Sequence, residues 1–152
     1  MSHSKLTWGV KASFRAYVEG MGGSITLDDG AVRTEDGTIV FPVAPGGDLA
    51  FTPDGSATGS LQLQGTVRFT AHGGMLDSIL AELRLEATQE GFVLTSLDAP
   101  LNQQRCAIAT LGPVEVGPGD TITIAAAITD EGMYQIADNY PPGTALDALI
   151  LT

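Results

Sequence analysis

Apolar and polar residues alternate along much of this chain, which is the pattern of half-buried β-strands. The clearest case is residues 61–71, where every second residue from Leu61 to Ala71 is apolar or glycine and the residues between them are polar. This alternation predicts a strand over the whole segment. His72 continues its polar face, and Gly73-Gly74 ends it.

Residues 8–18 alternate in the same way and predict a second half-buried strand. A helix remains the alternative towards the end of this segment, because Val10, Phe14 and Val18 also recur at helical spacing. Gly20 would end either element.

Turn signals divide the rest of the chain into short elements. Residues 76–87 fit the period of a strand and that of a helix, and we favour a strand for their second half. Residues 133–140 indicate a short helix or a loop. Further strands are predicted at residues 39–41, 49–51, 92–94, 105–111, 115–116, 121–128 and 146–151. The pattern predicts an all-β sandwich or open barrel of antiparallel strands with one or two short helices. Residues 1–5 are expected to form a flexible tail, and residues 6–152 a single domain.

Composition supports one folded domain and excludes some partners. The chain has 152 residues, of which 43 % are hydrophobic and 16 % charged, too apolar a balance for disorder. Its formal net charge of −11 would repel phosphate backbones, so nucleic acid is not expected as a partner. Solubility alone is the plainer explanation of the acidic balance.

The sequence lacks the motifs of several classes of catalytic and binding site. The sequence has no phosphate-binding P-loop, no dinucleotide fingerprint and no Gly-x-Ser-x-Gly elbow. With one cysteine it cannot form an intramolecular disulfide or a cysteine-based zinc site, and two histidines exclude a His-rich metal centre. We also find no apolar signal-peptide core and no apolar run of about 18 residues, the length of a membrane span.

Three residues next to glycine-rich or proline-rich turns are candidates for binding chemistry, namely Tyr17, His72 and Tyr140. The ordinary interpretation of each is structural, because tyrosines usually pack and a lone histidine at the end of a strand usually lies at the surface. Spacing alone therefore predicts no metal site.

Three segments resemble the HtaA domain family. Residues 6–18 (LTWGVKASFRAYV) are similar to the opening of that family, residues 67–77 (VRFTAHGGMLD) to its central His-Gly-Gly motif, and residues 140–147 (YPPGTALD) to its closing motif. The three matches occur in the family's order over nearly the whole chain. Two positions depart from the pattern, because Ala71 replaces a usual glycine and no proline follows Asp147.

The resemblance implies a haem-binding module for iron acquisition at the actinobacterial cell envelope. Carried over to this sequence, Tyr17 is the axial ligand of ferric haem, His72 is its hydrogen-bond partner, and Tyr140 is a third haem-associated residue. The residue types suit this role, since a phenolate is a hard anionic donor for ferric iron.

Neighbours of these motifs complete the expected site. The haem faces would be lined by Phe14, Val18, Met21, Met75 and Leu76, although each of these is also a candidate core residue. Donors for the haem propionates, chosen by proximity in sequence, are Ser13, Arg15 and Arg68.

Two other functions remain open. The fold could be an enzyme for a small apolar substrate, with Tyr17 and His72 as an acid–base pair, or a surface interaction domain without catalysis. We favour a binding protein over an enzyme, with haem-transfer proteins as partners and a homodimer as one assembly. The resemblance implies a cell-surface or secreted protein, and a cytoplasmic one stays open.

Overall fold

The computed structural model describes residues 3–54, 56–97, 104–136 and 140–152. It confirms an antiparallel β-fold with two short helices. A nine-stranded sheet has the strand order β3-β4-β1-β14-β13-β12-β11-β10-β7. Its strands are β1 (Lys5–Trp8), β3 (Val32–Arg33), β4 (Ile39–Pro42), β7 (Ser60–Gln62), β10 (Arg84–Thr88), β11 (Gly91–Leu97), β12 (Arg105–Val116), β13 (Ile122–Ile128) and β14 (Ala145–Leu151).

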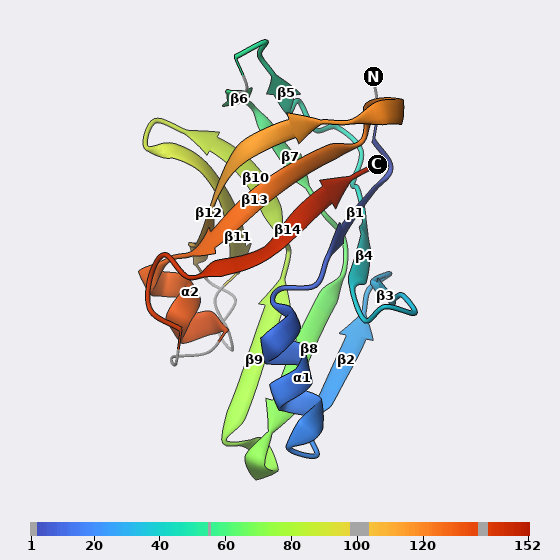
Figure 1. The fold of residues 1–152 in the computed structure, drawn as a ribbon, viewed down its shortest axis with the longest axis vertical. Coiled ribbons are helices and arrows are strands. Elements are labelled where there is room, and N and C mark those ends of the chain that lie inside the picture. Colours follow the sequence, from blue (N-terminus) through green and yellow to red (C-terminus); the bar gives the residue numbers. More distant parts are fainter. Residues whose placement is uncertain (1–2, 55, 98–103, 137–139) are drawn as a thin grey trace.

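This sheet curls into a half-barrel (Figure 1). The residues that follow β4 and β7 meet, because Val43 and Leu63 form an antiparallel bridge and the Ala44 amide donates to the Gln62 carbonyl at 2.8 Å. Alternate residues face inward, as β13 shows with Ile122, Ile124, Ala126 and Ile128 buried in turn. The core therefore lies inside the curl.

A smaller sheet extends from one end of the half-barrel. It contains β2 (Ser24–Asp28), β8 (Thr66–Ala71) and β9 (Leu76–Ala81), in the order β2-β8-β9. Helix α1 (Ala12–Gly20) lies across it, at the lower end of Figure 1. At the opposite end lie both termini and the hairpin of β5 (Ala50–Phe51) and β6 (Ala57–Thr58). The remaining elements are η1 (His72–Gly74), η2 (Pro118–Asp120) and α2 (Asp130–Gln135).

The strand predicted over residues 8–18 is wrong, and the helical alternative is correct. Strand β1 ends at Trp8 and α1 begins at Ala12. Helical spacing puts Phe14 and Val18 on the buried face of α1, where the Phe14 ring centroid lies 4.9 Å from that of Phe69 on β8. Burial of this apolar face on the small sheet decides between the two periods.

The N-terminal boundary also differs from the expected one. Residues 3–5, assigned to a tail from sequence, are held in place: the Ser4 amide donates to the Thr152 carbonyl at 2.9 Å, and β1 already begins at Lys5.

The strand predicted over residues 61–71 is divided between the two sheets. Its first part is β7 and its second part is β8, with a break at Gly65. Gly65 has a φ of 115°, and a Cβ there would lie 2.8 Å from the Cβ of Ala31. The apolar alternation continues across this break, so the pattern alone could not reveal it.

Residues 76–87 behave similarly. The strand favoured for their second half is confirmed as β10, while their first half is also a strand, β9, in the smaller sheet. The strands predicted at residues 105–111 and 115–116 form one strand, β12, whose register shifts between Leu111 and Val114. Within residues 133–140, α2 ends at Gln135, and residues 137–139 lie outside the described part of the chain.

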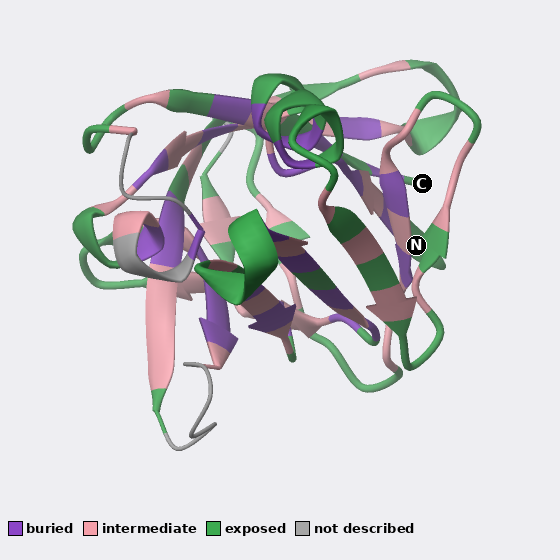
Figure 2. Cartoon of the chain, turned by 90° about the horizontal axis from the view of Figure 1, so that it is seen from below, coloured by how far each residue is buried: buried purple, intermediate pink, exposed green. Residues whose placement is uncertain are grey.

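Most residues of α1 are exposed, and buried positions alternate with more exposed ones along strands such as β8 and β13 (Figure 2). In the described ranges, no helix has the length and apolar character needed to cross a membrane.

Candidate functional site

Tyr17 and His72 form a hydrogen-bonded pair at the lower end of the molecule. The Tyr17 Oη and His72 Nε2 atoms are 2.5 Å apart, and their rings lie 5.6 Å apart at an interplanar angle of 55°. The Tyr17 side chain is 42 % exposed, and His72 is exposed as well. The pair therefore presents a phenol oxygen at the surface of the protein, open to a ligand.

Two backbone features bring these residues together. The chain leaving α1 passes very close to β8 at Gly23, where a Cβ would lie 2.1 Å from the Thr70 carbonyl oxygen. His72 has a φ of 56°, and Gly73 and Gly74 also have positive φ values, so the chain turns sharply from β8 into β9. The turn places the histidine beside the end of the helix that carries Tyr17.

Small exposed residues flank Tyr17 on its face of α1. We call Ser13, Ala16, Tyr17 and Gly20 the α1 strip, because their spacing puts them on one helical face and all four are exposed. A Cβ added to Gly20 would meet nothing within 4 Å, so the surface around the phenol is open. A planar ligand can therefore approach the helix closely.

Tyr140 marks the other end of the α1 strip. Its Oη lies 3.3 Å from the Ser13 Oγ, and its ring packs edge-on against Phe14 with the centroids 6.3 Å apart. The Lys11 Nζ lies 5.5 Å from the centre of the Tyr140 ring and donates to the Ala145 carbonyl at 2.7 Å. Hydroxyl groups and an ammonium group thus gather about one helical turn from Tyr17.

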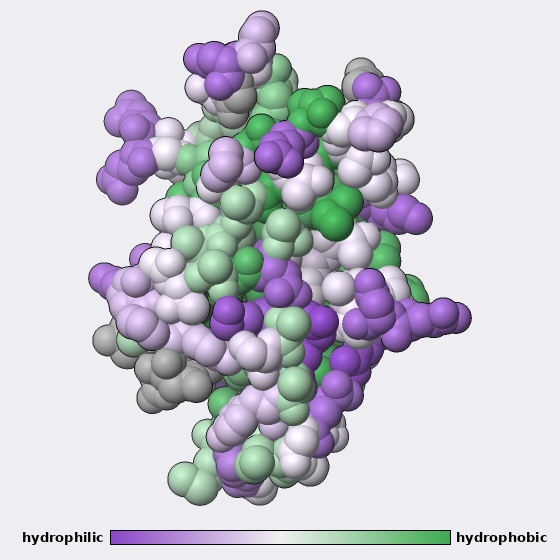
Figure 3. All heavy atoms as spheres, viewed as in Figure 1, coloured by the Kyte–Doolittle hydropathy of each residue, from purple (hydrophilic) through white to green (hydrophobic). Residues whose placement is uncertain are grey.

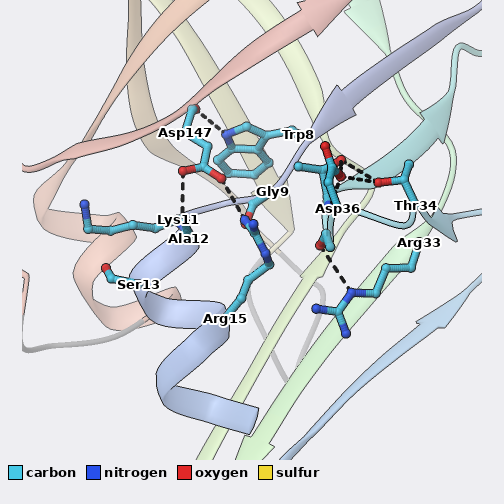
Figure 4. A network of polar contacts seen from close by, with 12 residues as sticks. Trp8, Gly9, Lys11, Ala12, Ser13, Arg15, Arg33, Thr34, Asp36 and Asp147 are labelled. Atoms are coloured by element: carbon cyan, nitrogen blue, oxygen red, sulfur yellow. Dashed lines mark hydrogen bonds and ion pairs between the residues drawn. The ribbon is translucent and has the colours of Figure 1, made fainter. Parts of the chain in front are cut away.

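Asp147 anchors the helix that carries the strip (Figure 4). Its Oδ1 accepts a hydrogen bond from the Ala12 amide at 3.1 Å, and its Oδ2 pairs with Arg15 Nη1 at 2.7 Å. Lys11 provides no side-chain cap, so this carboxylate, from β14, caps the helix and complements its dipole. Arg15 Nη1 also donates to the carbonyl of Gly9, where a Cβ would lie only 2.1 Å from that nitrogen.

A second ion pair holds the other end of α1. Arg33 on β3 donates to both carboxylate oxygens of Glu19, at 2.8 and 2.9 Å. These hydrogen bonds lower the pKa of Glu19 and raise that of Arg33. The helix is therefore fixed at both ends by residues distant in sequence.

The structure separates the three propionate donors expected from sequence. Ser13 lies on the α1 strip. Arg15 is buried in its ion pair with Asp147. Arg68 lies on the opposite face of β8 from Phe69, where two hydrogen bonds to Asp77 lower the pKa of that carboxyl group.

The residues expected to line the haem faces are separated too. Phe14 and Val18 belong to the core beneath α1, and Leu76 is half-buried. Met21 and Met75 are 52 % and 91 % exposed beside the pair. Of these five residues, the two methionines are the exposed ones.

Sequence reasoning missed two residues of this region. Lys11 lies in the opening motif two positions before Ser13, so its charge was a usable signal. Asp147 ends the closing motif, but its partners Ala12 and Arg15 are more than 130 positions away. Nothing local indicates that pairing.

The fold and the site define a class of protein: an antiparallel half-barrel domain whose first helix carries a surface tyrosine that is hydrogen-bonded to a histidine from the turn after β8. The family model HtaA, described as Htaa, matches residues 3–152. The chain therefore belongs to the HtaA family. A comparison with curated proteins found no match.

Solved structures agree with this assignment. The C-terminal domain of HtaA from Corynebacterium glutamicum is 26 % identical, with a TM-score of 0.68 over 98 % of this chain and 95 % of that one. The N-terminal domain of the same protein is 23 % identical, with a TM-score of 0.73 over 99 % and 97 %. Heme binding protein HtaB from the same organism is 20 % identical, with a TM-score of 0.69 over 98 % and 91 %. The two matches below 25 % identity support the fold alone.

Proposed function

We propose that this protein binds ferric haem on the α1 strip, where the Tyr17 oxygen would hold the iron. The observation that carries the proposal is the 2.5 Å contact between Tyr17 Oη, on the exposed face of α1, and His72 Nε2, in the turn after β8. Membership of the HtaA family supports it, and the heme-binding protein HtaB has the same fold.

The residues present suit this prosthetic group. Haem supplies a ferric centre that prefers hard anionic donors, and a tyrosine oxygen is such a donor. The hydrogen bond between the Tyr17 hydroxyl and His72 Nε2 would orient the phenol ring towards the ligand. The small side chains of Ser13, Ala16 and Gly20 leave room for a flat macrocycle against the helix.

The far end of the strip suits the propionates. The hydroxyls of Ser13 and Tyr140 can donate to carboxylates, and the Lys11 ammonium group adds a positive charge in an acidic protein. We assign the propionates to this end instead of to Arg15 or Arg68, because both guanidinium groups already pair with carboxylates.

Exposure of the ligand suits capture and transfer. A group held on an open face can be passed to a second protein without opening a cavity, and Met21 and Met75 provide adaptable apolar contacts beside it. We therefore propose a non-catalytic module that receives haem and hands it to another haem-transfer protein or to a second copy of itself. We also propose that it works at the cell surface or as a secreted protein.

The test is a ferric haem titration followed by visible absorption on three proteins. Wild type should saturate at one haem per chain with a tyrosinate charge-transfer band. Tyr17→Phe, which removes only the hydroxyl, should lose that band and the saturable binding. The matched variant Tyr140→Phe should keep the band. An unchanged spectrum in Tyr17→Phe would refute the assignment of the ligand, and no saturation in wild type would refute haem binding.

A further inference from the structure

A cavity of about 530 Å³ opens at the end of the half-barrel opposite the α1 strip. We call it the barrel-mouth cavity, and its wall includes Val43, Ala44, Phe51, Leu61, Ile122 and Leu151. The cavity lies beside the loop that follows β4 and the ends of β7, β13 and β14, near the termini in Figure 1. Its size falls within the range of pockets that bind small molecules.

The wall of this cavity belongs to the folded core. Leu151 and Ile122 are only 1 % and 6 % exposed, because the alternation of β13 and β14 turns them inward. The bridge between Val43 and Leu63 joins the two sides of the curl beneath the cavity wall. The space is thus formed by the barrel itself and does not depend on the position of one surface side chain.

The chemistry of the cavity excludes charged ligands. Among its lining residues only His3 and Asp120 are titratable, and the His3 Nε2 lies 3.0 Å from the Asp120 carbonyl oxygen at the rim. The Asp120 carboxylate and the net charge of −11 repel anions, and the apolar wall would remove water from any charged group that entered between its side chains without pairing it. Strongly hydrophobic residues gather in the upper half of the face shown in Figure 3.

We propose that the barrel-mouth cavity is a second binding site, which takes an uncharged apolar small molecule such as one with an aromatic ring or a short alkyl chain. This ligand enters the mouth of the barrel with its apolar part against Leu61, Ile122 and Leu151. The site is separate from the α1 strip, so both can be filled at once, and it does not depend on haem binding.

The test uses the neutral fluorescent probe N-phenyl-naphthylamine, whose emission rises in apolar surroundings. We expect a saturable rise at one probe per chain in the haem-free protein. The anionic probe anilinonaphthalene sulfonate should bind at least about tenfold more weakly, because of charge repulsion. Added haem should leave neutral-probe binding unchanged, after correction for absorption.

Two variants locate the site. Ala44→Phe fills the cavity, and Val116→Asp places a carboxylate at its rim, so each should weaken the neutral probe by about tenfold or more. Val116 is 68 % exposed, and its matched control Val32→Asp changes a valine that is 60 % exposed elsewhere. The control should bind like wild type.

The proposal fails if the neutral probe shows no saturable binding. It also fails if Val116→Asp and Val32→Asp bind equally, or if haem displaces the probe one for one. Because Val116 is a surface residue, its variant keeps the test decisive even if Ala44→Phe does not fold, which circular dichroism will show.

Discussion

The two ends of this molecule offer a ligand opposite kinds of surface. At the α1 end, Tyr17 on the helix and His72 in the turn after β8 present polar atoms on an exposed surface. At the other end, the barrel-mouth cavity offers about 530 Å³ bounded mainly by apolar side chains. If both proposals hold, one curled sheet supports two kinds of binding site. Its outer attachments hold donor atoms in a fixed geometry, and its interior leaves a volume that selects by polarity.

The largest expected effect is the loss of stability when the residue that anchors α1 is removed. Asp147→Ala removes the cap of α1 and leaves Arg15 without its carboxylate, so we expect a loss of about 3 kcal/mol in the free energy of unfolding. Urea unfolding measures this loss. At the exposed Asp28, Asp28→Ala should change stability by less than about 0.5 kcal/mol. Equal losses in both variants would contradict the anchoring role of Asp147.

The next largest effect is on haem affinity, and it tests which of the two histidines contributes to haem binding. His72→Ala removes the hydrogen-bond partner of Tyr17, and we expect haem affinity to fall by about 10- to 100-fold, the usual cost of losing a group that supports a ligand. His3→Ala, at the barrel mouth, should leave haem affinity unchanged. If His3→Ala weakened haem as much as His72→Ala, the division between the two ends would be wrong.

A smaller effect tests the propionate end of the strip. Lys11→Met keeps the length of the side chain but removes its charge, so haem should bind a few-fold more weakly, about 0.2–1 kcal/mol for one exposed ion pair. The dependence of haem affinity on salt should also decrease. Lys5→Met, on β1, is the control and should change neither quantity. Identical salt dependence in wild type and Lys11→Met would exclude the contact.

The smallest effect lies in the turn between β3 and β4, beside α1. Hydrogen bonds from the hydroxyls of Thr34 and Thr38 and from the Thr38 amide lower the pKa of Asp36 from 3.8 to about 2. The stability that this carboxylate contributes is complete above pH 3.8 and is lost as the pH falls through about 2. Titration by NMR measures that pKa. Thr38→Val should raise it towards 3.8, and an unchanged pKa in the variant would contradict the role of Thr38.

Sequence analysis predicted the β-class and most strand positions because the alternation of apolar residues is a local signal. It assigned residues 8–18 to a strand because two periods overlap there, and only the packing of Phe14 and Val18 on the small sheet selects the helix. It treated residues 61–71 as one strand because the break at Gly65 depends on the approach of Ala31, which is distant in sequence.

For the candidate site too, the sequence identified some features and the structure others. The order and spacing of the three motifs were sufficient to select Tyr17, His72 and Tyr140 by resemblance. Their geometry was not accessible, because His72 meets Tyr17 across 55 positions. Arg15 and Arg68 were chosen as propionate donors by proximity in sequence, yet each forms an ion pair, with Asp147 and Asp77 respectively.

The sequence by itself determined the fold class, the order of the family motifs and the acidic charge, since each is carried by local pattern or composition. The tertiary structure decided which face of α1 is exposed, which arginines are already paired and where the barrel leaves space. These properties depend on which segments pack together in the folded chain. The alternation of apolar and polar residues within one segment does not specify that packing.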